Sequence, residues 1–179
     1  MKFNCIAAGT LFLAAMASSQ AFELKGFKSI DFGASNATLT ANGLNCRPQG
    51  TNVVECSGAD TLFGFSGTVR AWLSSDKVTN IRMVVVDKKP VNLVDAYSQA
   101  LGKPKTFIQR YPRQDVTVSY WIAMDGTSVS TFTTGTTLVV KNPDTGEERH
   151  SATADYMDRA STMDLLAKAK KAEQTKRDF

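Results

Sequence analysis

The stretch TLFGFSGTVRAWLSSDKVTNIRMVVVD, residues 61–87, alternates apolar and polar side chains through two successive runs. In the first run the odd positions carry Phe63, Phe65, Val69, Ala71 and Leu73, and the even positions carry Ser66, Thr68, Arg70, Trp72 and Ser74. After Ser75-Asp76, a turn pair, the second run sets Ile81, Met83 and Val85 against Asn80 and Arg82. A period of two is that of a strand with one buried face. The stretch therefore predicts two antiparallel strands with one apolar and one polar face.

A short helix is predicted before this hairpin. Ser35 or Asn36 can cap its start, and Asn42-Gly43 ends it. A turn at 48–50 and a strand from Asn52 to Glu55 then lead into the hairpin.

The second half repeats this order with different residues. A helix over 93–101 stops at Gly102, and Val116, Val118, Tyr120, Ile122 and Met124 then alternate against Thr117, Ser119, Trp121 and Ala123. Asp125-Gly126 predicts a hairpin turn with a return strand that reaches Phe132. Further short strands are expected at 138–141 and 151–158.

The order helix, strands, helix, strands predicts an α+β fold: an antiparallel sheet with helices packed on one face and a C-terminal helix. Aligning Gly43 with Gly102 gives a weak tandem repeat with very little residue identity. The expected organisation is a signal peptide over 1–21, a first helix-plus-sheet unit over 22–90, a second over 91–150, and a strand-and-helix tail over 151–179.

The N-terminal residues, MKFNCIAAGTLFLAAMASSQA, have the form of a secretory signal peptide: Lys2, an apolar run, and Ser19-Gln20-Ala21 as a small-x-small cleavage pattern. A membrane anchor is the competing interpretation, but the apolar run falls short of the roughly 20 residues that span a bilayer. Cleavage near Ala21 predicts a periplasmic or secreted protein. Cys5 would be removed with the signal.

Cys46 and Cys56 remain, and such a pair has three common roles: metal ligands, a redox pair or a structural disulfide. A metal site needs about four ligands, and His150 lies far along the chain in a polar turn region. A redox pair of the C-x-x-C type needs closer spacing, since nine residues intervene here. A structural disulfide in an exported chain is therefore predicted.

Charge and motifs exclude several function classes. Without Lys2 the net charge falls from +4 to +3, too weak to indicate nucleic-acid binding. His150 is the one histidine, and no nucleophile elbow, Walker loop, dinucleotide glycine pattern or H-E-x-x-H motif occurs. No catalytic residue, cofactor or metal is therefore predicted. A hydrolase using paired carboxylates is a minor alternative, because the acidic residues stand singly at strand ends and turns.

The polar strand face supplies the candidate binding residues. Opposite the apolar positions lie Arg70, Trp72, Arg82, Trp121 and Phe132. Large aromatic side chains beside arginine are enriched at binding hot spots. The alternative is that both tryptophans are covered by the C-terminal segment or pack as cross-strand pairs.

The tail ASTMDLLAKAKKAEQTKRDF predicts a helix that starts at Ser161 or Thr162 and has Met163, Leu166 and Ala169 or Lys170 on one face. Its basic end could contact anionic lipid or an acidic protein. The favoured interpretation is that these lysines are solvated and complement the helix dipole.

The run Phe27-x-x-Ile30-x-Phe32-Gly33-x-Ser35, followed by a short helix, Cys46 and Cys56, resembles one repeat of the β-lactamase inhibitor protein (BLIP) family and the related unit of the BamE (SmpA/OmlA) family. Ala34 stands where that family motif has methionine, and the second half lacks both the motif and a disulfide. The resemblance implies a non-catalytic fold with one sheet face free to bind protein. The expected function is binding to a protein partner, which is either an envelope protein or an enzyme that the chain inhibits. The alternative is an accessory role in envelope assembly.

Overall fold

The computed structural model describes residues 22–111, 114–134, 138–141 and 143–177, so the expected signal peptide lies outside the described residues. The strands run over Gly26–Phe27 (β1), Ile30–Asp31 (β2), Asn45–Pro48 (β3), Val53–Leu62 (β4), Phe65–Ser74 (β5), Lys77–Asp87 (β6), Lys105–Tyr111 (β7), Gln114–Ile122 (β8), Ser128–Thr134 (β9), Leu138–Lys141 (β10) and Glu148–Met157 (β11). The helices run over Asn36–Ala41 (α1), Leu93–Leu101 (α2) and Arg159–Arg177 (α3).

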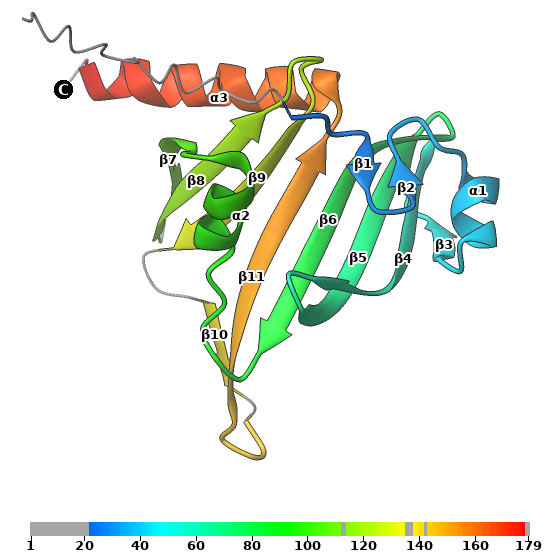
Figure 1. The fold of residues 1–179 in the computed structure, drawn as a ribbon, viewed down its shortest axis with the longest axis horizontal. Coiled ribbons are helices and arrows are strands. Elements are labelled where there is room, and N and C mark those ends of the chain that lie inside the picture. The colour runs from blue at the N-terminus through cyan, green and yellow to red at the C-terminus, as the bar shows by residue number, and fades with distance from the viewer. Residues whose placement is uncertain (1–21, 112–113, 135–137, 142, 178–179) are drawn as a thin grey trace, which may run out of the picture.

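Nine of the described strands form one antiparallel sheet, and this confirms the α+β class (Figure 1). The order across the sheet is β3-β4-β5-β6-β11-β9-β8-β7, with β10 paired to β11 beyond the end of β9. β1 and β2 form a separate small hairpin.

The two halves of the sheet meet at their last strands. In each half a helix is followed by a strand meander, α1 by β3 to β6 and α2 by β7 to β11. β6 and β11 pair from His150 with Asp87 to Met157 with Asn80. The expected tail strand is therefore a central strand of the sheet, and the residue-level repeat stays a prediction.

The two halves bury opposite faces of the sheet. Val69, Ala71 and Leu73 of β5 are buried with Leu39 of α1 and Tyr97 of α2. In the other half Val116, Val118, Tyr120, Leu165 and Ala169 form a separate buried cluster under α3. Tyr120 belongs to this second cluster and Trp121 to the first. Because successive strand residues point to opposite faces, α3 covers the face opposite α1 and α2. α1 and α2 thus share one face as expected, and the C-terminal helix α3 packs on the other face.

Local sequence signals set most of the helix bounds. The Ser35 side chain accepts from the backbone N–H of Thr38 and caps α1 as predicted, and Asn92 caps α2 by accepting from Asp95. α3 begins earlier than expected, because Asp158 accepts from the backbone N–H of Ser161. Met163 is also 59% exposed, so it does not lie on the buried face of α3.

Two turns differ from the expected strands. Phe63-Gly64 forms the tight turn between β4 and β5, with Leu62 opposite Phe65, so Phe63 is not an inward strand residue. Both turn residues have positive φ, 50° for Phe63 and 83° for Gly64, which suits a two-residue hairpin turn. Met124 lies beyond the end of β8 and is 85% exposed.

Among the described helices, none is long and apolar enough to cross a bilayer.

Candidate binding surface

One face of β3 to β6 carries none of the three described helices. Its residues are placed by strand register: Glu55 of β4 pairs with Trp72, Arg70 of β5 pairs with Arg82, and Arg82 of β6 pairs with Asp155 of β11. These side chains share the face opposite buried Val69 and Ala71. We call Arg70, Trp72 and Arg82, three of the residues predicted from sequence, the arginine–tryptophan face.

Arg82 is fixed in this face by Asp155. Its Nε donates to Asp155 Oδ1 at 2.6 Å and its second guanidinium nitrogen to Oδ2 at 3.0 Å. The Asp155 side chain is 4% exposed, whereas the Arg82 side chain is 44% exposed. A bidentate pair of this kind holds the guanidinium in one orientation. The Arg82 guanidinium is therefore held in place by Asp155 on one side and exposed to solvent on the other.

The electrostatics of the pair follow from that burial. The hydrogen bonds from Arg82 to Asp155 raise the pKa of Arg82, against the opposing effect of burial. Burial raises the pKa of Asp155, and the hydrogen bonds and charge of Arg82 act against that rise.

Trp72 lies half-buried beside this pair, and the guanidinium carbon of Arg82 lies 5.6 Å from its ring centroid. This is within the range of a cation–π contact, which adds about 0.5–1 kcal/mol at an exposed site. The Arg82 guanidinium thus contacts the ring of Trp72 on this face.

The exposed charge of the face is positive. Arg70 is 49% exposed and lies 3.8 Å from Glu55, whose side chain is 21% exposed. Arg47, opposite Glu55 on β3, is exposed as well. The three arginines are exposed, whereas Asp155 is buried and Glu55 is partly buried beside Arg70, so an approaching surface meets mainly guanidinium groups.

Tyr111, the last residue of β7, belongs to the surroundings of the face although β7 is at the far edge of the sheet. When ionised, its phenolate acts through space to raise the pKa of Arg82, and Tyr111 is 46% exposed.

Trp121 is wrong as a candidate binding residue. It is 4% exposed, lies in the core on the α2 side of the sheet, and donates from Nε1 to the carbonyl oxygen of Gly102 at 2.8 Å. Its ring centroid is 5.4 Å from that of Tyr97. The error arises because the apolar positions of β8 face the opposite way from those of β5.

Phe132 does share the side of the sheet that carries Arg82. It pairs with Thr153 of β11 and Val118 of β8. However, it is half-buried and packs against the cluster under α3. Phe132 therefore marks the boundary between the open half of this face and the half covered by α3.

Glu55, Asp155, Arg47 and Tyr111 were not singled out from the sequence. The sequence pattern predicted a strand that ends at Glu55 but did not show that Glu55 lies beside Arg70. Asp155 lies 73 residues from Arg82 in the chain. Only strand order could join them, and strand order is a long-range property of the fold.

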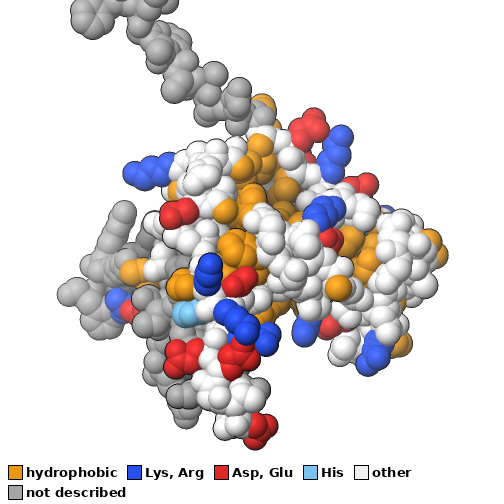
Figure 2. Space-filling view, turned by 60° about the horizontal axis from the view of Figure 1, so that its bottom comes forward, with side chains coloured by type: hydrophobic (Ala, Val, Ile, Leu, Met, Phe, Trp, Pro, Cys, Tyr) orange, Lys and Arg blue, Asp and Glu red, His pale blue; other side chains and the backbone are white. Residues whose placement is uncertain are grey.

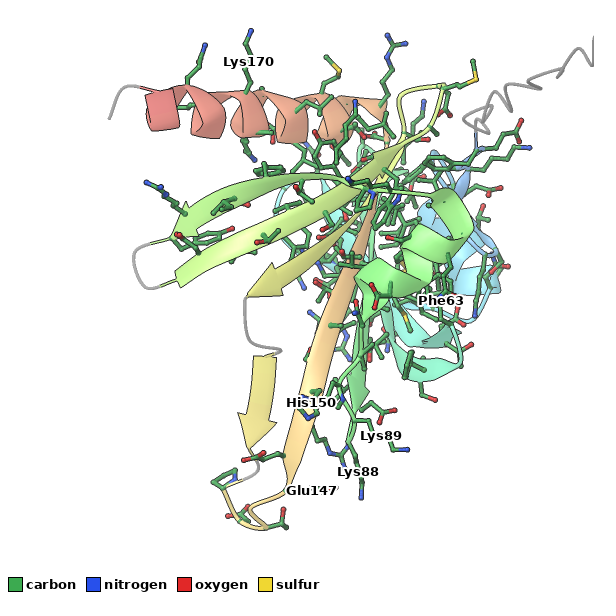
Figure 3. All side chains as sticks on the ribbon, turned by 60° about the vertical axis from the view of Figure 1, so that its left-hand side comes forward. Phe63, Lys88, Lys89, Glu147, His150 and Lys170 are labelled. Carbon is green, nitrogen blue, oxygen red and sulfur yellow. A yellow bond between two sulfur atoms is a disulfide. The ribbon has the colours of Figure 1, made fainter. Side chains whose placement is uncertain are left out.

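A second polar cluster lies at the far end of β6 and β11, where Figure 3 shows Lys88, Lys89, Glu147 and His150 close together. Lys88 Nζ lies 2.8 Å from Glu147 Oε1, and Arg149 lies 3.5 Å from Glu147 Oε2. The hydrogen bond and charge of Lys88 lower the pKa of Glu147. In Figure 2 the histidine is surrounded by both basic and acidic side chains. His150 lies in β11, opposite Asp87, and not in a turn.

Cys46 and Cys56 form the predicted disulfide, with an S–S distance of 1.99 Å. They are direct partners on β3 and β4, so the bond joins two strands rather than a helix end and a strand. In the part of the chain that the structure describes, no three His, Cys, Asp or Glu side chains group as metal ligands would.

Comparison with protein-family models, curated proteins and solved structures finds no match to this chain.

Proposed function

We propose that this chain is an exported, non-catalytic binding protein that acts by protein–protein contact through the arginine–tryptophan face. The observation that supports it most is the arrangement of Arg70, Trp72 and Arg82 on an uncovered sheet face, with Arg82 held by buried Asp155. Aromatic and arginine side chains that are already held in place lose little entropy on binding.

Charge indicates the kind of surface that would bind. Arg47, Arg70 and Arg82 are exposed, while the carboxylate of Asp155 is buried and that of Glu55 is partly buried. A partner with exposed carboxylates would be complementary, and its association would slow as salt is raised. Inhibition of an enzyme is one form that such binding takes.

Export is supported by the sequence of residues 1–21 and is compatible with the Cys46–Cys56 disulfide. The protein would then meet its partner in the periplasm or outside the cell.

The test is affinity capture from an exported-protein fraction with wild-type chain, with the double variant Arg70→Ala/Trp72→Ala, and with Lys25→Ala as the matched control. Lys25 is exposed and pairs only with Glu23, which is also exposed. The proposal expects one protein to be retained by wild type and control and lost with the double variant, with both variants folded by circular dichroism. Equal retention by all three would refute the proposal.

A further inference from the structure

The strand order from β3 to β7 ends in two edge strands that are protected to different degrees. β3 forms one edge; it has four residues, ends in Pro48, is tied to β4 by the disulfide and packs beside α1. β7 forms the other edge with seven residues, Lys105–Tyr111, in unbroken register with β8. In Figure 1 no described segment lies outside β7. An edge strand of this kind offers unpaired backbone N–H and C=O groups, which proteins ordinarily blunt with proline, bulges or short length.

The exposed edge is rigidly supported. Phe107 of β7 is buried in the cluster that contains Leu165 and Ala169 of α3. α3 therefore holds β7 from one face, and no described strand pairs with its outer edge. A strand that is already ordered pays less entropy when another strand pairs with it.

The charge along β7 has one sign. Lys105 and Arg110 are exposed, and β7 contains no acidic residue. Asp115 lies opposite Arg110 on β8, yet the two form no ion pair among the described residues. Because the two cations are five positions apart, they point to opposite faces of the sheet.

We propose that β7 is a docking edge for an extended acidic segment of a partner protein, which joins the sheet as an added strand. The segment would have carboxylates five positions apart, to meet Lys105 and Arg110, and apolar or β-branched residues between them beside half-buried Ile108. A second copy of β7 fits less well, because it would bring four cations and no anion to one seam.

The test uses the full chain and three six-residue peptides labelled for fluorescence anisotropy. The first peptide is Glu-Thr-Val-Thr-Val-Glu with blocked ends. The second peptide has Lys in place of both Glu residues. The third peptide has the sequence of the first, but the alternate backbone amides that would pair with β7 are N-methylated. Amide hydrogen exchange of β7 is followed in parallel. The variants are Lys105→Glu/Arg110→Glu, its milder form Lys105→Gln/Arg110→Gln, and Lys25→Ala as the control.

The proposal expects the first peptide to bind, to slow exchange of β7 amides, and to bind about three- to tenfold more weakly to the charge-reversed variant. The same variant should prefer the lysine peptide, and the control variant should bind as wild type does. Binding of the N-methylated peptide as strong as that of the first would refute strand addition. No binding of the first peptide at about 1 mM, or unchanged preference in both charge variants, would overturn the proposal. Because Arg70 and Trp72 are not part of this edge, its failure leaves the proposed function untouched, and the reverse also holds.

Discussion

Arg82 and Asp155 are joined by two hydrogen bonds, of 2.6 and 3.0 Å, across the seam where the two halves of the sheet meet. The carboxylate is buried and the guanidinium is partly open to solvent. The pair therefore belongs to both features of the molecule. Asp155 is buried in the seam between the two halves, and Arg82 is exposed on the arginine–tryptophan face.

Removing each partner should therefore cost different amounts. Arg82→Ala leaves a buried carboxylate without its partner and should lower the free energy of unfolding by about 3 kcal/mol. Asp155→Asn leaves a guanidinium that can turn to solvent and should cost about 1–2 kcal/mol. Urea unfolding of both variants measures the difference. Arg70→Ala, with a looser surface pair, is the control and should change stability by less than about 1 kcal/mol. Equal costs for Arg82→Ala and Asp155→Asn would contradict the asymmetry.

The two tryptophans should respond differently to truncation. Trp121→Ala removes a buried core ring and its hydrogen bond to Gly102 and should cost about 3–5 kcal/mol. Trp72→Ala removes a half-buried ring on the open face and should cost about 1 kcal/mol, mainly from the Arg82 contact. Thermal unfolding followed by circular dichroism compares them. A Trp72 variant as unstable as the Trp121 variant would make Trp72 a core residue.

The buried tyrosine pair predicts sensitivity to alkali. Tyr97 and Tyr156 share a hydrogen bond between their hydroxyls, and burial raises the pKa of Tyr156 to about 12 and that of Tyr97 further. These folded values lie above the unfolded value of about 10. The stabilisation is therefore complete below about pH 10 and is lost as the pH rises toward the folded values.

An absorbance titration of phenolate ionisation checks this, with Tyr111→Phe as the control that removes the hydroxyl of an exposed tyrosine. Two tyrosines should ionise only near or above about pH 12, together with unfolding. Ionisation of all four tyrosines near pH 10, with the fold intact, would contradict the buried pair.

The disulfide should stabilise without contributing to binding. Cys46→Ala/Cys56→Ala should lower the free energy of unfolding by about 2–3 kcal/mol, because the short loop gains freedom in the unfolded chain. Guanidinium unfolding measures this, and retention of the captured partner by the folded variant is the companion measurement. A variant that stays fully stable but loses the partner would give the bond a role at the interface.

The sequence predicted local structure well where alternation or capping was strong. Ser35 as the cap of α1, Gly102 as the end of α2 and the inward positions Ile81, Met83 and Val85 of β6 are all confirmed. Each of these depends on residues that are close together in the chain. β7 was missed, because KTFIQRY has only a weak apolar alternation and derives its order from β8 and α3.

Local sequence patterns did not predict which face of the whole sheet a given side chain lies on. An alternating run shows which residues share a face but not which face of the whole sheet that is. Trp121 was therefore assigned to the wrong side, whereas Arg70, Trp72 and Arg82 lie together on consecutive paired strands. Asp155 shows the same limit, because its pairing with Arg82 requires β11 to lie beside β6.

The central claim is that a protein partner binds the arginine–tryptophan face, and hydroxyl-radical footprinting tests it most directly. The captured partner would be mixed with the full chain and exposed to hydroxyl radicals. Mass spectrometry would then measure the oxidation of Trp72, Met124 and Met163. Met124 and Met163 are 85% and 59% exposed, and they belong to the turn after β8 and to α3, which contribute no residue to the face, so they serve as internal controls. The account predicts that the partner protects Trp72 and leaves both methionines as reactive as in the free protein. Unchanged oxidation of Trp72 with protection of Met163 would contradict it and place the contact on α3 instead.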